Sequence, residues 1–113
     1  MNHRRQYRAL ATATFAAMAM PFLASADIGA ARQQALRHLL FQDCGSCHGI
    51  TLKGGLGPAL TREALADKPV AMLRDVILNG RSGTPMPPWK PFMTEPEAEW
   101  LAQQLHAGVT NDK

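Results

Sequence analysis

The sequence predicts a small all-α domain. Apolar residues recur at three- and four-residue spacing in several stretches of the chain, as they do in helices that bury one face. Alternation of apolar and polar side chains, which indicates strands, is not seen. Glycines gather over residues 49–58, and five of the eight prolines lie over 85–96. We therefore expect short helices separated by two irregular segments.

The first helix is expected over residues 30–43, where Leu36, Leu39, Leu40 and Phe41 supply an apolar face. It leads directly into the cysteine-containing run discussed below. A loop follows over 49–58, because four glycines in this segment leave no room for a helix. The loop lacks the Lys-Ser/Thr pair and the preceding strand of a phosphate-binding loop, so we do not expect it to bind phosphate.

Three further helices are expected. Thr61 can cap a short helix over 62–66. Pro69 suits the first turn of the next, which carries Val70, Leu73, Val76 and Ile77 and ends at Asn79-Gly80.

The segment 85–96 should be extended and stiff, since proline fixes its own backbone and restricts the preceding residue. Thr94-x-x-Glu97 is a capping box that begins a helix reaching about Ala107. One side of that last helix is apolar and is expected to pack in the core: Trp100, Leu101 and Leu105.

Residues 1–26 are expected to be a signal peptide that is removed, leaving one domain over 27–113. Three arginines, an apolar stretch over 9–23 and a small-residue site at 24–26 form the usual three regions of such a peptide. An uncleaved membrane anchor is the alternative, but the apolar stretch is shorter than the roughly 20 residues that span a bilayer. The pair Arg4-Arg5 hints at twin-arginine export. We nevertheless expect the general secretory route to the periplasm.

Without that segment the chain has no net charge. The whole sequence has 12 Lys and Arg against 9 Asp and Glu, and removing Arg4, Arg5 and Arg8 leaves nine of each. The basicity therefore belongs to the export signal and gives no reason to expect a nucleic-acid partner. No stable membrane insertion is expected either.

The run Cys44-Gly45-Ser46-Cys47-His48 is the attachment signature of a c-type haem. Two thiols three positions apart can each form a thioether with one vinyl group of the same porphyrin. His48 then offers an imidazole nitrogen as the proximal iron ligand. Cys44 and Cys47 are the only cysteines in the chain, and one such run predicts one covalently bound haem c.

Three other readings of this run are weaker. A reversible Cys44–Cys47 disulfide of the thioredoxin kind needs a βαβ context, which the sequence lacks. A zinc site needs four ligands, and the remaining histidines have no zinc-finger spacing. Chance occurrence is the third reading. A haem also suits the length of the chain, because so short a domain gains limited stability from its side chains alone.

Met86 is the best candidate for the second axial ligand. Pro85 and Pro87 flank it and stiffen the backbone, which lowers the entropy lost when the thioether is held at the iron. Met72 reads as core filler, and Met93 adjoins the last helix cap. A proline-rich recognition segment is the alternative for Pro85-x-x-Pro88, but such a ligand makes little sense inside a compact periplasmic domain. Surface helix residues His38 and His106 are fallback iron ligands.

Three blocks of the chain together resemble the small bacterial class I cytochromes c. They are Cys44-x-x-Cys47-His48, Leu56-Gly57-Pro58-Ala59-Leu60 and Thr84-Pro85-Met86-Pro87-Pro88-Trp89. The resemblance implies crossed terminal helices around one haem, with Cys44 and Cys47 as attachments and His48 and Met86 as axial ligands. It also implies that the Pro58 carbonyl accepts the other His48 ring N–H, which fixes the imidazole.

The sequence around these blocks is similar more narrowly to the cytochrome c55X proteins of denitrifying bacteria. That likeness implies a monomeric periplasmic electron carrier, not an enzyme, and its favoured partner is cytochrome cd1 nitrite reductase. An accessory electron-transfer role in haem d1 maturation is a second reading. A ligand-binding or weakly peroxidatic haem protein is a third, and it requires Met86 to be absent from the iron.

Partner contact should be brief and small, at an exposed haem edge. Residues expected at this rim by resemblance are Gly45, Ser46, Leu56, Gly57 and the prolines beside Met86. The zero net charge predicts weak long-range steering, although Lys53 or Arg81 could orient docking locally. Trp89 and Arg81 are candidates for binding the haem propionates.

Overall fold

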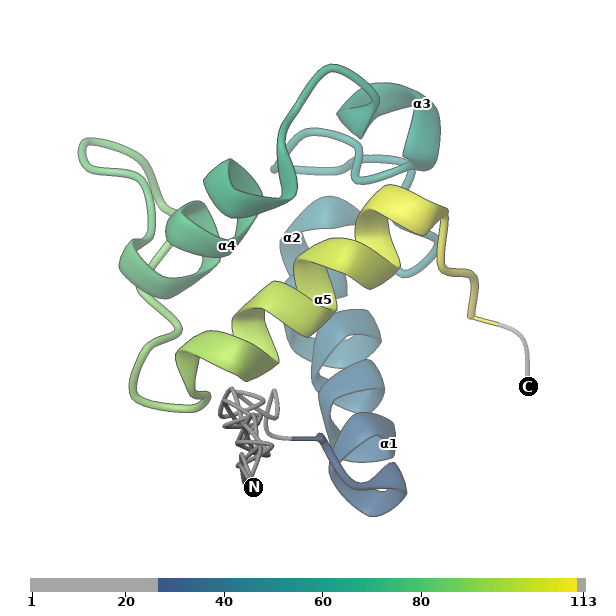
Figure 1. The fold of residues 1–113 in the computed structure, drawn as a ribbon. Helices are drawn as coiled ribbons and strands as arrows, with labels where there is room; N and C mark the ends of the chain where they lie inside the picture. Colours follow the sequence, from purple (N-terminus) through teal and green to yellow (C-terminus); the bar gives the residue numbers. More distant parts are fainter. Residues whose placement is uncertain (1–26, 112–113) are drawn as a thin grey trace, which may run out of the picture.

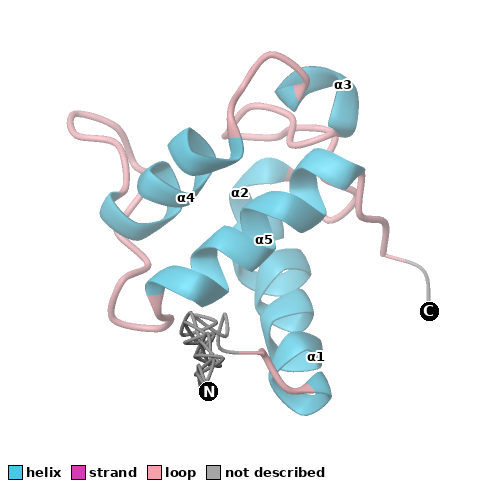
Figure 2. Cartoon of the chain, in the orientation of Figure 1, coloured by secondary structure: helices cyan, strands magenta, loops and turns pink. Residues whose placement is uncertain are grey.

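The computed structural model describes residues 27–111, which form a helical domain (Figure 1). Its elements are α1 (Ala30–Leu39), the π-helix η1 (Leu40–Cys44), α2 (Gly45–His48), α3 (Arg62–Leu65), α4 (Val70–Asn79) and α5 (Glu95–Ala107). No strand occurs between residues 27 and 111 (Figure 2). The predicted all-α class is confirmed, whereas the predicted signal peptide lies outside the described residues.

The first helix begins at Ala30, as predicted, but it continues past residue 43 as α1, η1 and α2 in succession. The π segment was not expected from the sequence. Buried positions in this stretch include Leu36, Leu40 and His48, which follow one another at multiples of four. Four residues overshoot a turn of 3.6 by roughly 40°, so a regular α-helix would carry these positions progressively off one face. A wider π turn takes up part of that drift.

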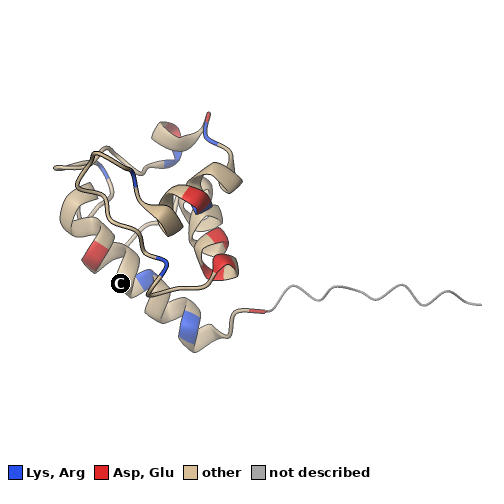
Figure 3. Ribbon diagram, turned by 90° about the vertical axis from the view of Figure 1, so that its left-hand side faces the viewer, with Lys and Arg blue, Asp and Glu red and all other residues tan. Residues whose placement is uncertain are grey.

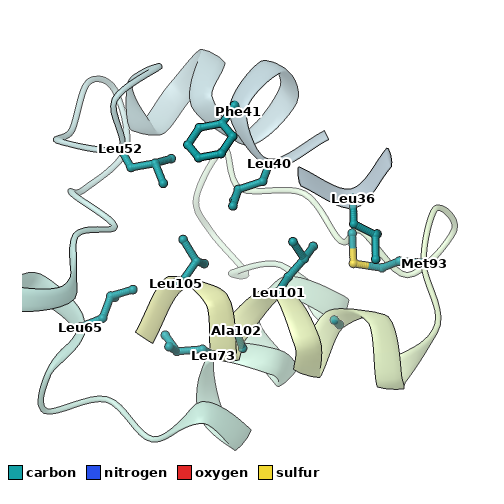
Figure 4. Packing of buried hydrophobic residues seen from close by; sticks show 11 residues of the cluster. Leu36, Leu40, Phe41, Leu52, Leu65, Leu73, Met93, Leu101, Ala102 and Leu105 are labelled. Atoms are coloured by element: carbon teal, nitrogen blue, oxygen red, sulfur yellow. The ribbon is translucent and has the colours of Figure 1, made fainter. Parts of the chain in front are cut away.

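Helix α5 lies across the molecule and packs against α1, α3 and α4 (Figure 1). Figure 4 shows the buried apolar side chains that pack together around α5. The buried set contains residues from every part of the described chain: Leu36, Leu40, Phe41, Leu52, Leu65, Leu73, Met93, Ala98, Leu101, Ala102 and Leu105. The apolar faces predicted for the first, third and last helices therefore contribute to one core.

Of the methionines between residues 27 and 111, Met72 differs from expectation. Met72 is 45% exposed on α4 and does not fill the core, whereas Met93 is only 6% exposed and belongs to it. The reason is the register of α4, in which Leu73 faces α5 and its neighbour Met72 is turned away. Helical periodicity identifies the buried face only when the apolar residues are confined to that face. Helix α4 carries apolar residues on both sides of Leu73, so the sequence does not single out one face.

The helix ends agree closely with the sequence prediction. The Thr61 hydroxyl accepts a hydrogen bond from the Ala64 amide at 3.3 Å, and α4 ends at Asn79 before Gly80. Thr94 and Glu97 form the predicted capping box at the start of α5. The stretch 85–96 is extended only in part, because 90–92 form a turn and Pro96 lies in the first turn of α5. Proline is tolerated there since that turn has no partner for its amide.

Helices α1 and α5 are tied together where both begin. Arg32 donates to both Glu97 carboxylate oxygens, at 2.7 and 3.0 Å, and also to the Phe92 carbonyl at 2.9 Å. Two parallel N–H···O bonds fix the guanidinium in one orientation. None of the helices in the described part of the chain is long and apolar enough to span a bilayer.

Candidate haem site

Cys44 ends η1 and Cys47 lies on α2, so one continuous helical stretch presents both thiols. Neither cysteine is in a disulfide. Cys44 is half-buried and Cys47 is exposed. Burial, with a smaller contribution from neighbouring Asp43, raises the pKa of the Cys44 thiol to about 11, so this thiol is protonated at neutral pH. The site thus offers two unbridged sulfur atoms on the same turn.

The His48 side chain is held by a single well-placed hydrogen bond. Its Nδ1 atom lies 2.7 Å from the carbonyl oxygen of Pro58, and the residue is only 8% exposed. A carbonyl oxygen can only accept, so Nδ1 carries the proton and donates. Nε2 then keeps its lone pair and is the nitrogen available to a metal. This is the contact that the resemblance implied for Pro58.

Glycines allow the loop after α2 to fold back onto the helix. The amides of Gly54 and Gly57 donate to the carbonyls of His48 and Cys47, each at 2.8 Å. A Cβ atom on Gly57 would lie 2.8 Å from the His48 ring. Gly49 has φ +89°, and a Cβ there would approach the Gly54 carbonyl to 2.7 Å. From the sequence these glycines read only as helix breakers, and their role in seating the imidazole was missed.

Met86 lies in the loop that follows α4, close to the C-terminal end of that helix. Gly80 has φ +67°, and a Cβ atom there would lie 2.6 Å from the Met86 carbonyl oxygen. That same carbonyl accepts from the Arg81 amide at 3.2 Å, and the Trp89 amide donates to Ile77 at 3.0 Å. The Met86 backbone is therefore bonded to the residue that follows Gly80, and the chain after Met86 is bonded to α4 at Ile77. Its side chain is half-buried.

The remaining candidates are placed less favourably. Met93 is enclosed in the core, His38 is exposed on α1, and His106 is half-buried on α5. Between residues 27 and 111, no group of three or more His, Cys, Asp or Glu side chains could hold a metal ion. The zinc reading therefore has no ligand set in this part of the molecule.

The donor set fits a haem. Two unbridged thiols and a histidine with a free Nε2 are the groups that a covalently attached, iron-ligating porphyrin requires. Apolar side chains near them are also uncovered: Leu56 is 96% exposed and Ile50 is 64% exposed. A haem held there supplies one-electron redox chemistry, while Pro58 fixes the tautomer of the ligating imidazole.

The comparisons with known proteins agree with this site. Residues 31–103 match the family described as cytochrome c oxidase, cbb3-type, subunit III. A cytochrome c55X from Pseudomonas aeruginosa is 54% identical over 99 residues, which cover 88% of this chain and 83% of that protein. The chain belongs to the cytochrome c55X family. The solved c-type cytochrome NirC is 56% identical, with a TM-score of 0.69, over 70% of this chain and 93% of that one.

This cytochrome c55X therefore has the class I cytochrome c fold and carries a covalently bound haem c. It is an electron carrier and not an enzyme, like the family members that it matches along most of its length. The single attachment run in the sequence makes it a mono-haem protein.

A partial likeness extends to a larger protein. The solved dihydro-haem d1 dehydrogenase NirN, in complex with DHE, is 32% identical with a TM-score of 0.60. The match covers 68% of this chain but only 17% of that protein. Cytochrome c55X thus corresponds to one small part of the dehydrogenase.

Proposed function

We propose that this cytochrome c55X is a periplasmic one-electron carrier for nitrite reduction in denitrification. Cys44 and Cys47 would form the thioethers, and His48 and Met86 would bind the iron. The observation that carries this proposal is the fixed imidazole, whose Nδ1 is bonded to Pro58 and whose Nε2 is free. Residues 1–26 direct export and are removed before Asp27, which N-terminal sequencing of the periplasmic protein would test.

With His48 and Met86 both bound, the iron would have no open position for substrate. What remains is outer-sphere transfer of one electron, in which no bond forms or breaks. The neutral thioether of Met86 favours the ferrous state and raises the potential relative to a second imidazole. Pinning of both ligand loops limits reorganisation between the two redox states.

The first candidate partner is cytochrome cd1 nitrite reductase, with the cytochrome as donor. Stopped-flow mixing of the reduced holoprotein with the oxidised reductase from the same organism tests this directly. Fast, saturable oxidation of the haem supports a respiratory donor. Negligible transfer excludes that partner.

The second candidate is the oxidation of dihydro-haem d1, and a specific observation favours it. The fold of this chain recurs within a dihydro-haem d1 dehydrogenase. Dehydrogenation releases two electrons and two protons, so two molecules of a one-electron acceptor are reduced for each substrate molecule. The oxidised cytochrome would accept these electrons, and the protons would pass to solvent.

One pair of measurements separates the two roles. Reduction of the oxidised cytochrome during turnover of the dehydrogenase supports maturation, whereas oxidation of the reduced cytochrome by the nitrite reductase supports respiration. A deletion strain gives an independent answer. Loss of a maturation partner leaves the reductase without haem d1, but loss of a respiratory donor leaves it fully loaded and without reductant.

The reading as a ligand-binding haem protein makes a different prediction. It requires Met86 to leave the iron readily, so carbon monoxide would bind the reduced holoprotein at low concentration. We expect no binding to the unmodified protein and ready binding to Met86→Ala.

A further inference from the structure

Leu52 has a backbone conformation that is unusual for its residue type. Its φ is +60°, and it is the one residue other than glycine with a positive φ between residues 27 and 111. This conformation brings the Cβ atom of an L-residue close to the following carbonyl oxygen, so glycine is the usual residue there. Four glycines lie in the same loop, yet this position carries a bulky apolar side chain. The surrounding structure must therefore offset the strain.

Burial of the side chain provides that offset. Leu52 is 2% exposed, whereas the other residues over 50–58 are exposed or half-buried. Figure 4 shows the Leu52 side chain reaching from the loop into the buried cluster, on the side that holds Phe41. A leucine loses the free energy of its apolar burial if the loop that carries it moves away from the core. Leu52 is therefore an apolar anchor for the loop that follows α2.

Ion pairs do not hold this loop in place. Its one charged residue is Lys53, which forms no ion pair with any residue between 27 and 111. Acidic residues lie mainly on the helices, as the red segments of Figure 3 show. The position of the loop therefore depends on apolar burial and on backbone hydrogen bonds.

Both backbone polar groups of Leu52 take part in those hydrogen bonds. Its amide donates to the Gly49 carbonyl, and its carbonyl accepts from the Leu60 amide, each at 2.8 Å. The second bond joins the two ends of the segment that contains Pro58. The Pro58 carbonyl in turn accepts from Nδ1 of His48 at 2.7 Å. Leu52 thus links the core to the closed segment whose carbonyl faces the imidazole.

We propose that Leu52 is a positioning residue for His48, which acts through the Pro58 carbonyl and thereby lowers the reduction potential of the haem. An imidazole that donates its Nδ1–H to a carbonyl is a more basic ligand. A more basic ligand favours ferric over ferrous iron, and hydrogen bonding around the ligands is one means by which a protein sets a haem potential. Reduction adds one electron to the iron, and the Nδ1 proton stays on the ring. This inference rests on the proposed function, in which His48 binds the iron.

Two substitutions separate the side chain from the backbone conformation. Leu52→Gly removes the strain and the anchor together, whereas Leu52→Met keeps an apolar side chain of similar volume. If the backbone conformation alone positioned Pro58, Leu52→Gly would hold the loop as well as the unmodified protein does. We expect a more mobile loop in Leu52→Gly and an unchanged one in Leu52→Met.

Proton NMR of the reduced holoprotein follows the His48 Nδ1 proton directly. In Leu52→Gly this proton should exchange with solvent at least about tenfold faster, because the loop opens more often. Its signal should also move upfield, since a weaker hydrogen bond deshields the proton less. A redox titration of the same sample should give a higher reduction potential. Leu52→Met should change none of these three quantities.

Leu36→Ala is the control for the loss of a core leucine. Leu36 is fully buried on α1, and Figure 4 places it beside Met93, away from Leu52. This variant should lower the unfolding temperature, as Leu52→Gly does, but leave the reduction potential unchanged. Equal shifts of the potential in the two variants would overturn the proposal, because general destabilisation would then explain them. An unchanged potential and exchange rate in Leu52→Gly would also overturn it.

A second measurement uses the unmodified protein and so does not depend on the folding of any variant. If Leu52 closes the loop, one opening event breaks both the bond from Leu60 and the bond from His48 to Pro58. The Leu60 amide and the His48 Nδ1 proton should therefore exchange with deuterium with the same opening free energy. Exchange of the Nδ1 proton while the Leu60 amide stays protected would contradict the proposal.

The proposed function would fail in a different way. A His48 ring bound to the iron lies beneath the porphyrin, so its carbon-bound protons should be shifted far upfield in the unmodified protein. Ordinary shifts would show that His48 does not bind the iron and would reject the proposed ligation. Upfield shifts, together with a Leu52→Gly variant that behaves as the unmodified protein does, would reject only the positioning role of Leu52.

Discussion

At the scale of single residues, the site depends on glycines as much as on ligands. Cys44, Cys47 and His48 were predicted as haem residues because their types and spacing form a recognisable run, and Met86 stays a predicted iron ligand. The need for glycine at positions 57 and 80 could not be predicted from the sequence. It depends on close contacts between segments that only the fold brings together.

Gly57→Ala should destabilise the holoprotein by about 1–3 kcal/mol, since the new methyl would lie 2.8 Å from the His48 ring. The ring, the loop or both must shift, which weakens the bond to Pro58. Guanidinium unfolding measures the change. Gly29→Ala is the control, because its Cβ would have no atom within 4 Å. An equal effect of the two substitutions would show that packing against His48 is not the cause.

Gly80→Ala and Gly83→Ala form a second matched pair. Both glycines have positive φ, +67° and +75°, so each alanine bears the strain of that backbone conformation, about 1–2 kcal/mol. Only the Gly80 variant also meets the backbone at Met86, whereas Gly83 opens onto free space. We expect Gly80→Ala alone to weaken the absorption band of the iron–methionine bond. Loss of that band in both variants would indicate general strain in the loop instead.

At the scale of elements, the helix ends were the most predictable feature. The local helix geometry and the choice of buried face between those ends were the least predictable. Thr61, Thr94 and Glu97 act through atoms three residues away, so their roles are local and visible in the sequence. The π segment over 40–44 helps to keep later residues of the same helical stretch on the buried face. No local feature of the sequence predicted it. The exposure of Met72 was missed for a similar reason.

The pairing of α1 with α5 predicts a specific pH dependence. Hydrogen bonding to Arg32, opposed in part by burial, lowers the pKa of Glu97 from 4.5 to about 2. A carboxylate with a depressed folded-state pKa stabilises the fold above its ordinary pKa, and this contribution is lost as the pH falls from 4.5 towards 2. The unfolding temperature of Glu97→Gln should therefore be lower than that of the unmodified protein at pH 6. The two unfolding temperatures should converge near pH 2.

Glu63→Gln serves as the comparison for this experiment. Glu63 is an exposed carboxylate on α3 and forms no ion pair between residues 27 and 111. Its substitution should leave the pH profile unchanged. A Glu97→Gln profile parallel to that of the unmodified protein would mean that the Arg32 contact does not couple the two helices in solution.

At the scale of the whole molecule, the haem completes the core. A domain this small buries a smaller share of its surface than a larger one does, and Leu56 and Ile50 remain uncovered by protein. Fold class followed from helical periodicity and the attachment run, because these are properties of the chain as a whole.

The chain without haem should therefore be largely unfolded. Cys44→Ala/Cys47→Ala, produced without the attachment machinery, should lose most of its far-ultraviolet helical signal and show no cooperative thermal transition. Circular dichroism of this variant beside the holoprotein gives the comparison. A sharp transition in the variant would show that the protein core is sufficient alone.

The proposed restriction of the protein to electron transfer depends on Met86 as the second protein ligand of the iron, beside His48. Proton NMR of the reduced holoprotein tests it most directly, because a methionine bound to haem iron has its methyl group shifted far upfield by the ring current. We predict one such methyl, retained in Met72→Ala and absent from Met86→Ala. Absence of an upfield methyl from the unmodified protein, or its persistence in Met86→Ala, would contradict the account.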